Sequence, residues 1–387
     1  MWKGPPIGPD LGVLRTPLSA HCAGRSPAPP PPFGDLMTWM IRPDAFVAFE
    51  NEEIRNSLSR YIRVVRGEEA PLFRIAQRIR VDISGGLWKA HEEGLNVMKE
   101  FLSGECDLED QGQISLLDVK IRLAKELARN CRLCEWKCGV NRLEGEIGVC
   151  RVRGPRISSA FIHMGEEPPI TPSGTIFFSG CNFKCVFCQN WDISQYPESG
   201  KPVSERDLSI MMDRLRRSGA RNINLVGGEP TPNLPSILAA LPLTSEDFPI
   251  IWNSNMYMSE EATKLLIGIV DLWLPDFKYW DDECARKYSK VVRYRETVTR
   301  NLKIAYELGD MVIRHLVLPN HLECCTKPIL KWISDNTPNA LVNIMAQYRP
   351  EYMARNYPEI DKRVRRDEMV EAYRYADDLG LKWRSVS

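Results

Sequence analysis

The chain has 387 residues, enough for two or three domains with a large hydrophobic core. Apolar residues make up 43% and charged residues 26%, as is typical of soluble globular proteins, and 51 Lys and Arg balance 51 Asp and Glu. This balance gives no reason to expect nucleic acid or an acidic membrane as a partner. No run of about 18 apolar residues and no signal peptide are evident. We therefore expect a cytoplasmic protein.

Residues 1–36 are rich in proline and include the run Pro29 to Pro32. Without hydrophobic periodicity, such a segment cannot bury enough surface to offset its ordering entropy, so we predict a disordered leader. Met37 and Met40 follow directly, and an over-extended start of translation explains the leader equally well.

Residues 37–130 are predicted to form a helical extension, interrupted at Gly85-Gly86. Within Gln113 to Asn130, apolar residues recur with a spacing close to the period of an α-helix. We expect these helices to form a cap or an extra layer on a catalytic domain.

Residues 131–155 contain four cysteines spaced as C-x2-C-x3-C-x11-C: Cys131, Cys134, Cys138 and Cys150. Nearby glycines permit tight turns, so the pattern predicts a closed site of four thiolates. Structural zinc and a second iron–sulfur cluster both fit, and the spacing does not separate them. Basic residues in the segment, such as Arg142, are interpreted as a solvated face. The remaining cysteines are interpreted as ordinary thiols: Cys22, Cys106, Cys284, Cys324 and Cys325.

From residue 156 to 387, short apolar runs alternate with helical patterns, which predicts parallel βαβ units. The predicted strands are Thr175–Ser179, Asn222–Val226, Pro249–Trp252, Asp271–Leu274, Met311–Leu318 and Leu341–Ala346. The predicted helices are Ser204–Ser218, Ser259–Val270, Thr297–Leu308 and Lys327–Asn336, the first opened by a Ser204–Asp207 capping box. Six strands suit an α/β fold of the partial (β/α)6 barrel type, with its chemistry at the C-terminal ends of the strands.

Three cysteines follow the first predicted strand: Cys181, Cys185 and Cys188, spaced as C-x3-C-x2-C. Three thiolates can hold a [4Fe-4S] cluster whose fourth iron has no protein ligand. S-adenosylmethionine (SAM) can chelate such an iron through its amino and carboxylate groups. A zinc knuckle is the alternative, but zinc sites favour paired spacings with a fourth ligand, and no histidine lies near the triplet.

Further polar motifs lie at the ends of later strands. Gly227-Gly228-Glu229 follows the second strand, where glycines allow close backbone approach and the carboxylate can accept a hydrogen bond from a bound amino acid. The later strands end at three groups, each of which could equally be a capped strand end or a buried ion pair: Asn253-Ser254-Asn255, Asp276 with Lys278, and Arg314-His315.

Together these segments resemble the radical SAM superfamily, and most closely an uncharacterised branch similar to pyruvate formate-lyase activating enzyme. The resemblance runs from about Asn130 to Pro350 and includes the segment from His163 to Pro169. It implies reductive cleavage of SAM to a 5′-deoxyadenosyl radical. It places Phe187 near the adenine and Gly227, Gly228 and Glu229 at the methionine amino group. It assigns the three later groups to the same cofactor site.

Activating enzymes of this type have an aspartate where this chain has Asn253, so the departure argues against a monovalent cation site. The resemblance also implies an electron donor such as flavodoxin or ferredoxin. Three functions remain open: action on a protein or peptide, action on a small molecule, and a non-catalytic metal-binding interaction module. The helical extension is long enough to cover part of the side opening of a six-stranded barrel, which would restrict access to large substrates.

Overall fold

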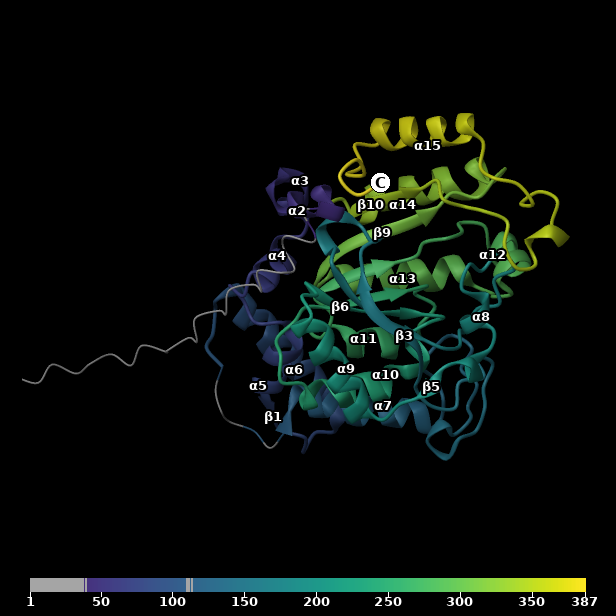
Figure 1. The fold of residues 1–387 in the computed structure, drawn as a ribbon. Helices are drawn as coiled ribbons and strands as arrows, with labels where there is room; N and C mark the ends of the chain where they lie inside the picture. Colours follow the sequence, from purple (N-terminus) through teal and green to yellow (C-terminus); the bar gives the residue numbers. More distant parts are fainter. Residues whose placement is uncertain (1–37, 39, 109–111, 113) are drawn as a thin grey trace, which may run out of the picture.

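The computed structural model describes residues 38, 40–108, 112 and 114–387, so the predicted leader and Cys22 lie outside the described residues. Its centre is one mixed sheet with the strand order β10-β9-β8-β7-β6-β4-β3-β5 (Figure 1). The strands of its parallel part are β4 (Ser173–Phe178), β6 (Asn222–Gly227), β7 (Ile250–Ser254), β8 (Leu272–Pro275), β9 (Asp310–Leu316) and β10 (Leu341–Met345).

These six strands pair in chain order and all run parallel, which confirms the predicted partial barrel. Each matches a predicted strand to within a few residues. Their side chains alternate between the outer helices and the hollow of the barrel, because successive residues of a strand point to opposite faces. The hollow is polar along the second strand, where Asn222 and Asn224 alternate with the buried Ile223 and Leu225.

The helices that cover the sheet are α9 (Glu205–Arg217), α10 (Leu234–Ala240), α11 (Glu260–Leu266), α12 (Asp282–Ser289), α13 (Tyr294–Tyr306), α14 (Lys327–Asn336) and α15 (Arg366–Asp378). The predicted capping box opens α9: Ser204 Oγ accepts from Asp207 N at 3.1 Å, and Asp207 accepts from Ser204 N. Helix α11 ends earlier than predicted, since Gly268 adopts a positive φ of 77° before β8. Helices α10, α12 and α15 were not predicted.

Two strands of the sheet were missed by the sequence analysis, the long β3 and the two-residue β5. Strand β3 (Arg156–His163) runs antiparallel to β4 and also pairs with the short β5 (Lys201–Pro202). It is half exposed along most of its length, so it lacks the continuous apolar run by which the buried parallel strands were recognised. Beyond it, a short 3-10 turn, Pro168–Ile170, leads the chain into β4.

The N-terminal part is helical: α2 (Pro43–Phe46), α3 (Glu52–Ser57), α4 (Ser59–Val65), α5 (Leu72–Arg78), α6 (Leu87–Ser103) and α7 (Leu116–Arg129). Helix α7 packs on the outer helices α10 and α11. Residues of α4 such as Tyr61 and Ile62 pack beneath the barrel in one cluster with Ile251, Leu274 and Val312. The extension therefore covers the bottom and the outside of the barrel, and the start of α2 also reaches its hollow, so partial cover of the side opening stays a prediction.

A buried ion pair fixes this docking. The Asp271 carboxylate, fully buried at the start of β8, accepts from Arg60 Nη1 at 2.6 Å and from the backbone N–H groups of Leu72 and Ile250. One strand further, Asp310 accepts from the backbone N–H of Tyr61 at 2.7 Å. Two carboxylates at the strand starts thus hold α4 and α5 against the barrel.

Replacing Arg60 by methionine should destabilise the protein by about 3–5 kcal/mol, because it leaves the Asp271 carboxylate buried without its cation. The matched control is Arg63→Met on the same helix, whose half-exposed pair with Glu69 should contribute less than about 1 kcal/mol. Urea unfolding followed by circular dichroism measures both. Equal losses in the two variants would show that the buried pair does not anchor the helix.

Candidate functional site

The predicted site lies at the C-terminal ends of the parallel strands, where the loop after β4 meets the turn after β6. Gly180 precedes the first cysteine with a φ of 91°, and Gly227 has a φ of 116°. A Cβ on Gly228 would lie 2.2 Å from the carbonyl oxygen of Gly180. Only glycine at position 228 allows this contact, so the Gly-Gly turn and the cysteine loop are built against each other.

The loop brings Cys181, Cys185 and Cys188 together, the first two buried and the third half buried. Burial raises the pKa of all three thiols, that of Cys185 to about 12, and neighbouring thiols raise the pKa of Cys181 and Cys185 further. A bound metal would have to displace these protons, as metal binding by thiolates generally does.

Each thiol also has a polar partner. Cys181 Sγ accepts from the backbone N–H of Phe183 at 3.3 Å. Cys185 Sγ lies 3.0 Å from Ser289 Oγ, and Cys188 Sγ lies 3.2 Å from Ser194 Oγ. Hydrogen bonds to ligand sulfurs stabilise the thiolate form, so three buried thiols with these partners fit an iron–sulfur cluster.

Helix α12 holds the middle of the cysteine loop. The carbonyl oxygens of Tyr288 and Ser289 accept from the backbone N–H groups of Val186 at 2.8 Å and Lys184 at 3.0 Å. Ser289 Oγ also lies 2.8 Å from the Tyr279 hydroxyl. The last turn of α12 therefore sets the position of Cys185, a role that the sequence analysis did not anticipate.

Among the predicted site residues, Glu229 accepts hydrogen bonds from three different residues. Its Oε1 accepts from Ser254 Oγ at 2.7 Å and from the backbone N–H of Thr231, and its Oε2 accepts from Asn255 N at 3.0 Å. Burial raises the pKa of Glu229 although these donors favour its charge. The Asn255 side chain donates to Asn182 Oδ1 at 2.8 Å, which joins this carboxylate to the cysteine loop.

Asp276 and Lys278 form an ion pair of 2.6 Å beside the triplet. Burial lowers the pKa of Lys278, but Asp276 and Cys185 raise it more, so the ammonium stays charged. Phe187 is buried against Tyr279 and Tyr348, with ring centroids 6.5 and 5.7 Å away. A cation, a carboxylate and an aromatic wall thus lie next to the thiols.

Arg314 and His315 point to opposite sides of β9. The Arg314 guanidinium pairs with two buried carboxylates, Glu166 and Glu167, the latter through Nε at 2.7 Å. The His315 ring is buried, with Nδ1 2.8 Å from Phe277 O and Nε2 2.9 Å from Thr326 Oγ1. Burial lowers the pKa of His315 to about 4, so the ring is neutral and belongs to the packing around the barrel.

Glu166 and Glu167 were not predicted as site residues. They lie between β3 and β4, and Glu167 also accepts from Asn343 on β10 at 2.8 Å. The sequence signal for them was a pair of consecutive glutamates followed by two prolines, in the segment from His163 to Pro169. Their partner Arg314 lies about 150 residues further along the chain, too far for local spacing to reveal the pairing.

The hollow of the barrel forms a cavity of about 900 Å³ that reaches from the cysteine loop to the C-terminal segment. Its lining combines charged, amide and apolar side chains from several strands, among them Glu166, Asn190, Asn253, Arg314 and Met345. Asn190 lies two residues after Cys188, and Asn253 is the head of the third predicted group. The cavity is large enough for a small molecule or a peptide segment.

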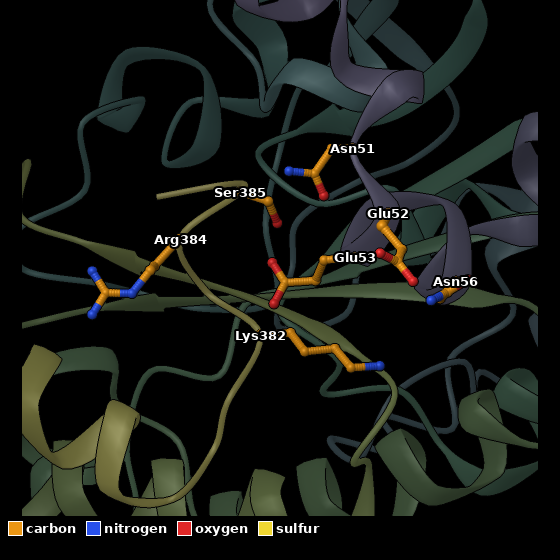
Figure 2. A pocket seen from close by; sticks show the side chains of 7 residues that line it. All are labelled: Asn51, Glu52, Glu53, Asn56, Lys382, Arg384 and Ser385. Atoms are coloured by element: carbon orange, nitrogen blue, oxygen red, sulfur yellow. The ribbon is translucent and has the colours of Figure 1, made fainter.

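A second hollow, of about 580 Å³, lies between α3 and the C-terminal segment (Figure 2). Figure 2 shows Glu53 lying between Lys382 and Ser385, with Arg384 turned away from them. Its lining contains none of the residues predicted for the cofactor site.

The four upstream cysteines are also gathered in space. Cys131, Cys134 and Cys150 are buried, and burial, together with the neighbouring thiols, raises the pKa of Cys134. The segment is attached to the triplet loop, because Trp136 Nε1 donates to Asn182 O at 2.8 Å. The interpretation of Arg142 as a solvated residue is wrong: it is buried and donates to Val152 O at 2.9 Å.

Comparison with known proteins agrees with this geometry. The sequence profile of the radical SAM superfamily matches residues 175–333, which include the triplet, the Glu229 turn and Lys278. The chain belongs to the radical SAM superfamily and is a radical SAM enzyme.

Two curated relatives, both uncharacterised proteins of Methanocaldococcus jannaschii, match the chain. MJ0674 is 43% identical over 337 residues, covering 84% of this chain and 98% of the relative. MJ0808 is 26% identical over 250 residues, covering 59% of this chain and 73% of the relative.

Solved structures with a related arrangement include Streptococcus suis SuiB bound to its precursor peptide SuiA. That match has 12% identity, covers 76% of this chain and 62% of SuiB, and has a TM-score of 0.39. The cobalamin-dependent enzyme OxsB matches with 12% identity and a TM-score of 0.33 over 82% of this chain and 50% of OxsB. Among the described residues, none of the helices combines the length and the apolar character needed to cross a membrane.

Proposed function

We propose that Cys181, Cys185 and Cys188 hold a [4Fe-4S] cluster and that the neighbouring residues bind SAM for reductive cleavage. When bound, the cluster supplies the electron that breaks a carbon–sulfur bond of SAM and releases a 5′-deoxyadenosyl radical. The observation that carries the proposal is the convergence of two buried thiols, one half-buried thiol, Glu229 and the Asp276–Lys278 pair at one end of the barrel.

The protein groups have separate tasks in this proposal. The Glu229 carboxylate accepts from the SAM ammonium, and its bonds from Ser254 and Asn255 fix its orientation. Lys278 pairs with the SAM carboxylate, while Asp276 accepts from a ribose hydroxyl. Phe187 supplies an apolar wall for the adenine. Because these side chains are largely buried, they exclude water that would otherwise quench a radical.

We further propose that the radical acts on a protein or peptide, as in an enzyme that activates another protein. Support comes from the size of the cavity and from its extension to the exposed Arg384 in the C-terminal segment. A small molecule is the second candidate, because the volume of the cavity also suits one. The non-catalytic alternative predicts intact metal binding without SAM cleavage.

For the upstream cysteines we propose a second iron–sulfur cluster rather than zinc. Thiolates around one zinc ion lie within about 4 Å of each other, whereas each ligand of a four-iron cluster binds a different iron. Within the described part of the chain, no three of these four sulfurs lie mutually within 4.8 Å. The Trp136–Asn182 contact brings this site beside the triplet, so it could relay electrons from a flavodoxin or ferredoxin.

The test uses protein reconstituted anaerobically with iron and sulfide, reduced with dithionite and supplied with SAM. We expect 5′-deoxyadenosine, and its absence from a fully loaded protein would support the non-catalytic alternative. Substrate is then supplied as an extract of the source organism grown in deuterated medium and separated by size. At least one size fraction should transfer deuterium to 5′-deoxyadenosine. Treating that fraction with protease should abolish the transfer. Transfer that survives protease would overturn the protein-substrate proposal.

A further inference from the structure

Cys284, Cys324 and Cys325 form a third group of thiols, although the sequence analysis interpreted them as unrelated. Cys284 lies on α12, while Cys324 and Cys325 lie on a single π-helical turn, Leu322–Thr326, before α14. Their three sulfur atoms lie within 4.8 Å of one another. Among the residues that the structure describes, no other group of three His, Cys, Asp or Glu side chains brings its ligand atoms within this distance of one another. Cys325 is buried, and the other two are half buried.

The spacing of these sulfurs fits a single metal ion. Thiolates about 2.3 Å from a tetrahedral zinc ion are separated by about 3.8 Å. The Cys324 and Cys325 sulfurs are 3.8 Å apart, far longer than a disulfide bond. Ligands of a four-iron cluster bind different irons and must lie farther apart. The π-helical turn thus directs two consecutive side chains toward the same point.

A carboxylate and an open cavity lie beside this group of thiols. Asp281 Oδ2 lies 3.9 Å from Cys284 Sγ, while its Oδ1 caps α12 by accepting from Glu283 N at 2.8 Å. An open cavity of about 440 Å³ is lined by Cys284 and by the cationic Arg286 and Lys287.

We propose that Cys284, Cys324 and Cys325 bind one zinc ion, with Asp281 able to complete its coordination. The site is separate from both cysteine groups already described. It fastens α12 to the turn before α14. Ser289, which lies 3.0 Å from Cys185, is five residues beyond Cys284 on α12, or about 7.5 Å along the helix axis. Zinc would therefore stabilise the helix that positions a thiol of the triplet.

The test measures zinc and iron per chain in protein purified anaerobically and washed with a chelator. Cys284→Ala and the double variant Cys284→Ala/Cys324→Ala should each lose about one zinc per chain with iron unchanged. Cys106→Ala, a cysteine outside all three groups, should lose neither metal. In the wild type, chelation of this zinc should lower the melting temperature, and the same treatment should leave Cys284→Ala unchanged.

Two results would overturn the proposal. Equal zinc in the wild type and Cys284→Ala would mean that the three thiols hold no zinc, and a fall in iron would identify an iron–sulfur cluster instead. Circular dichroism must show native helix content in each variant that is compared. Cys284→Ala changes a single half-buried side chain, so it serves where the double variant fails to fold.

Discussion

Replacing Cys185 by alanine is expected to abolish the formation of 5′-deoxyadenosine while leaving the barrel folded. The thiol is one of three that ligate the proposed cluster, and two thiolates leave a four-iron cluster under-ligated. The loop itself should persist, because it is held by backbone bonds from Lys184 and Val186 to the end of α12. The rate should fall below detection after anaerobic reconstitution, and iron per chain should decrease.

Cys106→Ala is the control for this variant and should retain both the iron and the reaction. A second control is Ser289→Ala, which removes the polar partner that Cys185 shares with the Tyr279 hydroxyl and should retain the cluster with a lower reduction potential. Formation of 5′-deoxyadenosine by Cys185→Ala at the parent rate would refute the assignment of the triplet.

Replacing Arg314 by methionine should be the most destabilising single change in the cavity, at about 3–5 kcal/mol. The guanidinium pairs with both Glu166 and Glu167, each of which is almost fully buried. Burial alone would raise the pKa of Glu166, but Arg314 and His163 hold it below its usual range. Without Arg314, two carboxylates would remain buried side by side with no cation to balance them.

The loss of unfolding free energy in Arg314→Met should decrease as the pH falls from 7 toward 4.5. In the wild type, the lowered pKa of Glu166 contributes stability above about pH 4.5, the usual glutamate value, which is lost as the pH falls further. In Arg314→Met, burial raises the pKa of Glu166, so the folded state gains protons as the pH decreases from 7 toward 4.5. The difference in unfolding free energy between the two proteins should therefore shrink over that range.

Urea unfolding at pH 7 and pH 5 measures this change. Arg349→Met, which removes an exposed partner of Glu351, is the matched control and should change stability by less than about 1 kcal/mol at both values. Adding Glu166→Gln and Glu167→Gln to Arg314→Met should restore part of the loss. A deficit that stays constant with pH would mean that packing, rather than charge, is what Arg314 provides.

The parts of the site that could be predicted from sequence are those encoded by short spacings. The Cys181 triplet and the Gly-Gly-Glu turn each lie within a few residues, and each follows a strand with a clear apolar pattern. The barrel was predictable for the same reason, since its parallel strands are buried on both faces. Strand β3, which lies next to the edge of the sheet and has partly exposed faces, gave no comparable signal.

The parts that could not be predicted depend on contacts between distant segments. Arg314 meets Glu167 across 147 residues, and only the closing of the barrel brings them together. Cys284 and Cys324 lie 40 residues apart, and an unpredicted helix carries the first of them. His315 had the same strand-end position as Arg314, but the alternation of β9 turns its ring away from the hollow.

The contact between α4 and the strand starts has a consequence for the order of events during synthesis. The Tyr61 N–H meets Asp310 across 249 residues, so the helix leaves the ribosome long before its partner strand exists. At roughly 5–20 residues per second, that interval is about 12–50 s. Throughout it, the apolar face formed by Leu58, Tyr61 and Ile62 is incompletely covered, because its partners Val312 and Leu341 have not yet been made. The nascent chain therefore offers a chaperone a long period in which to bind this helix.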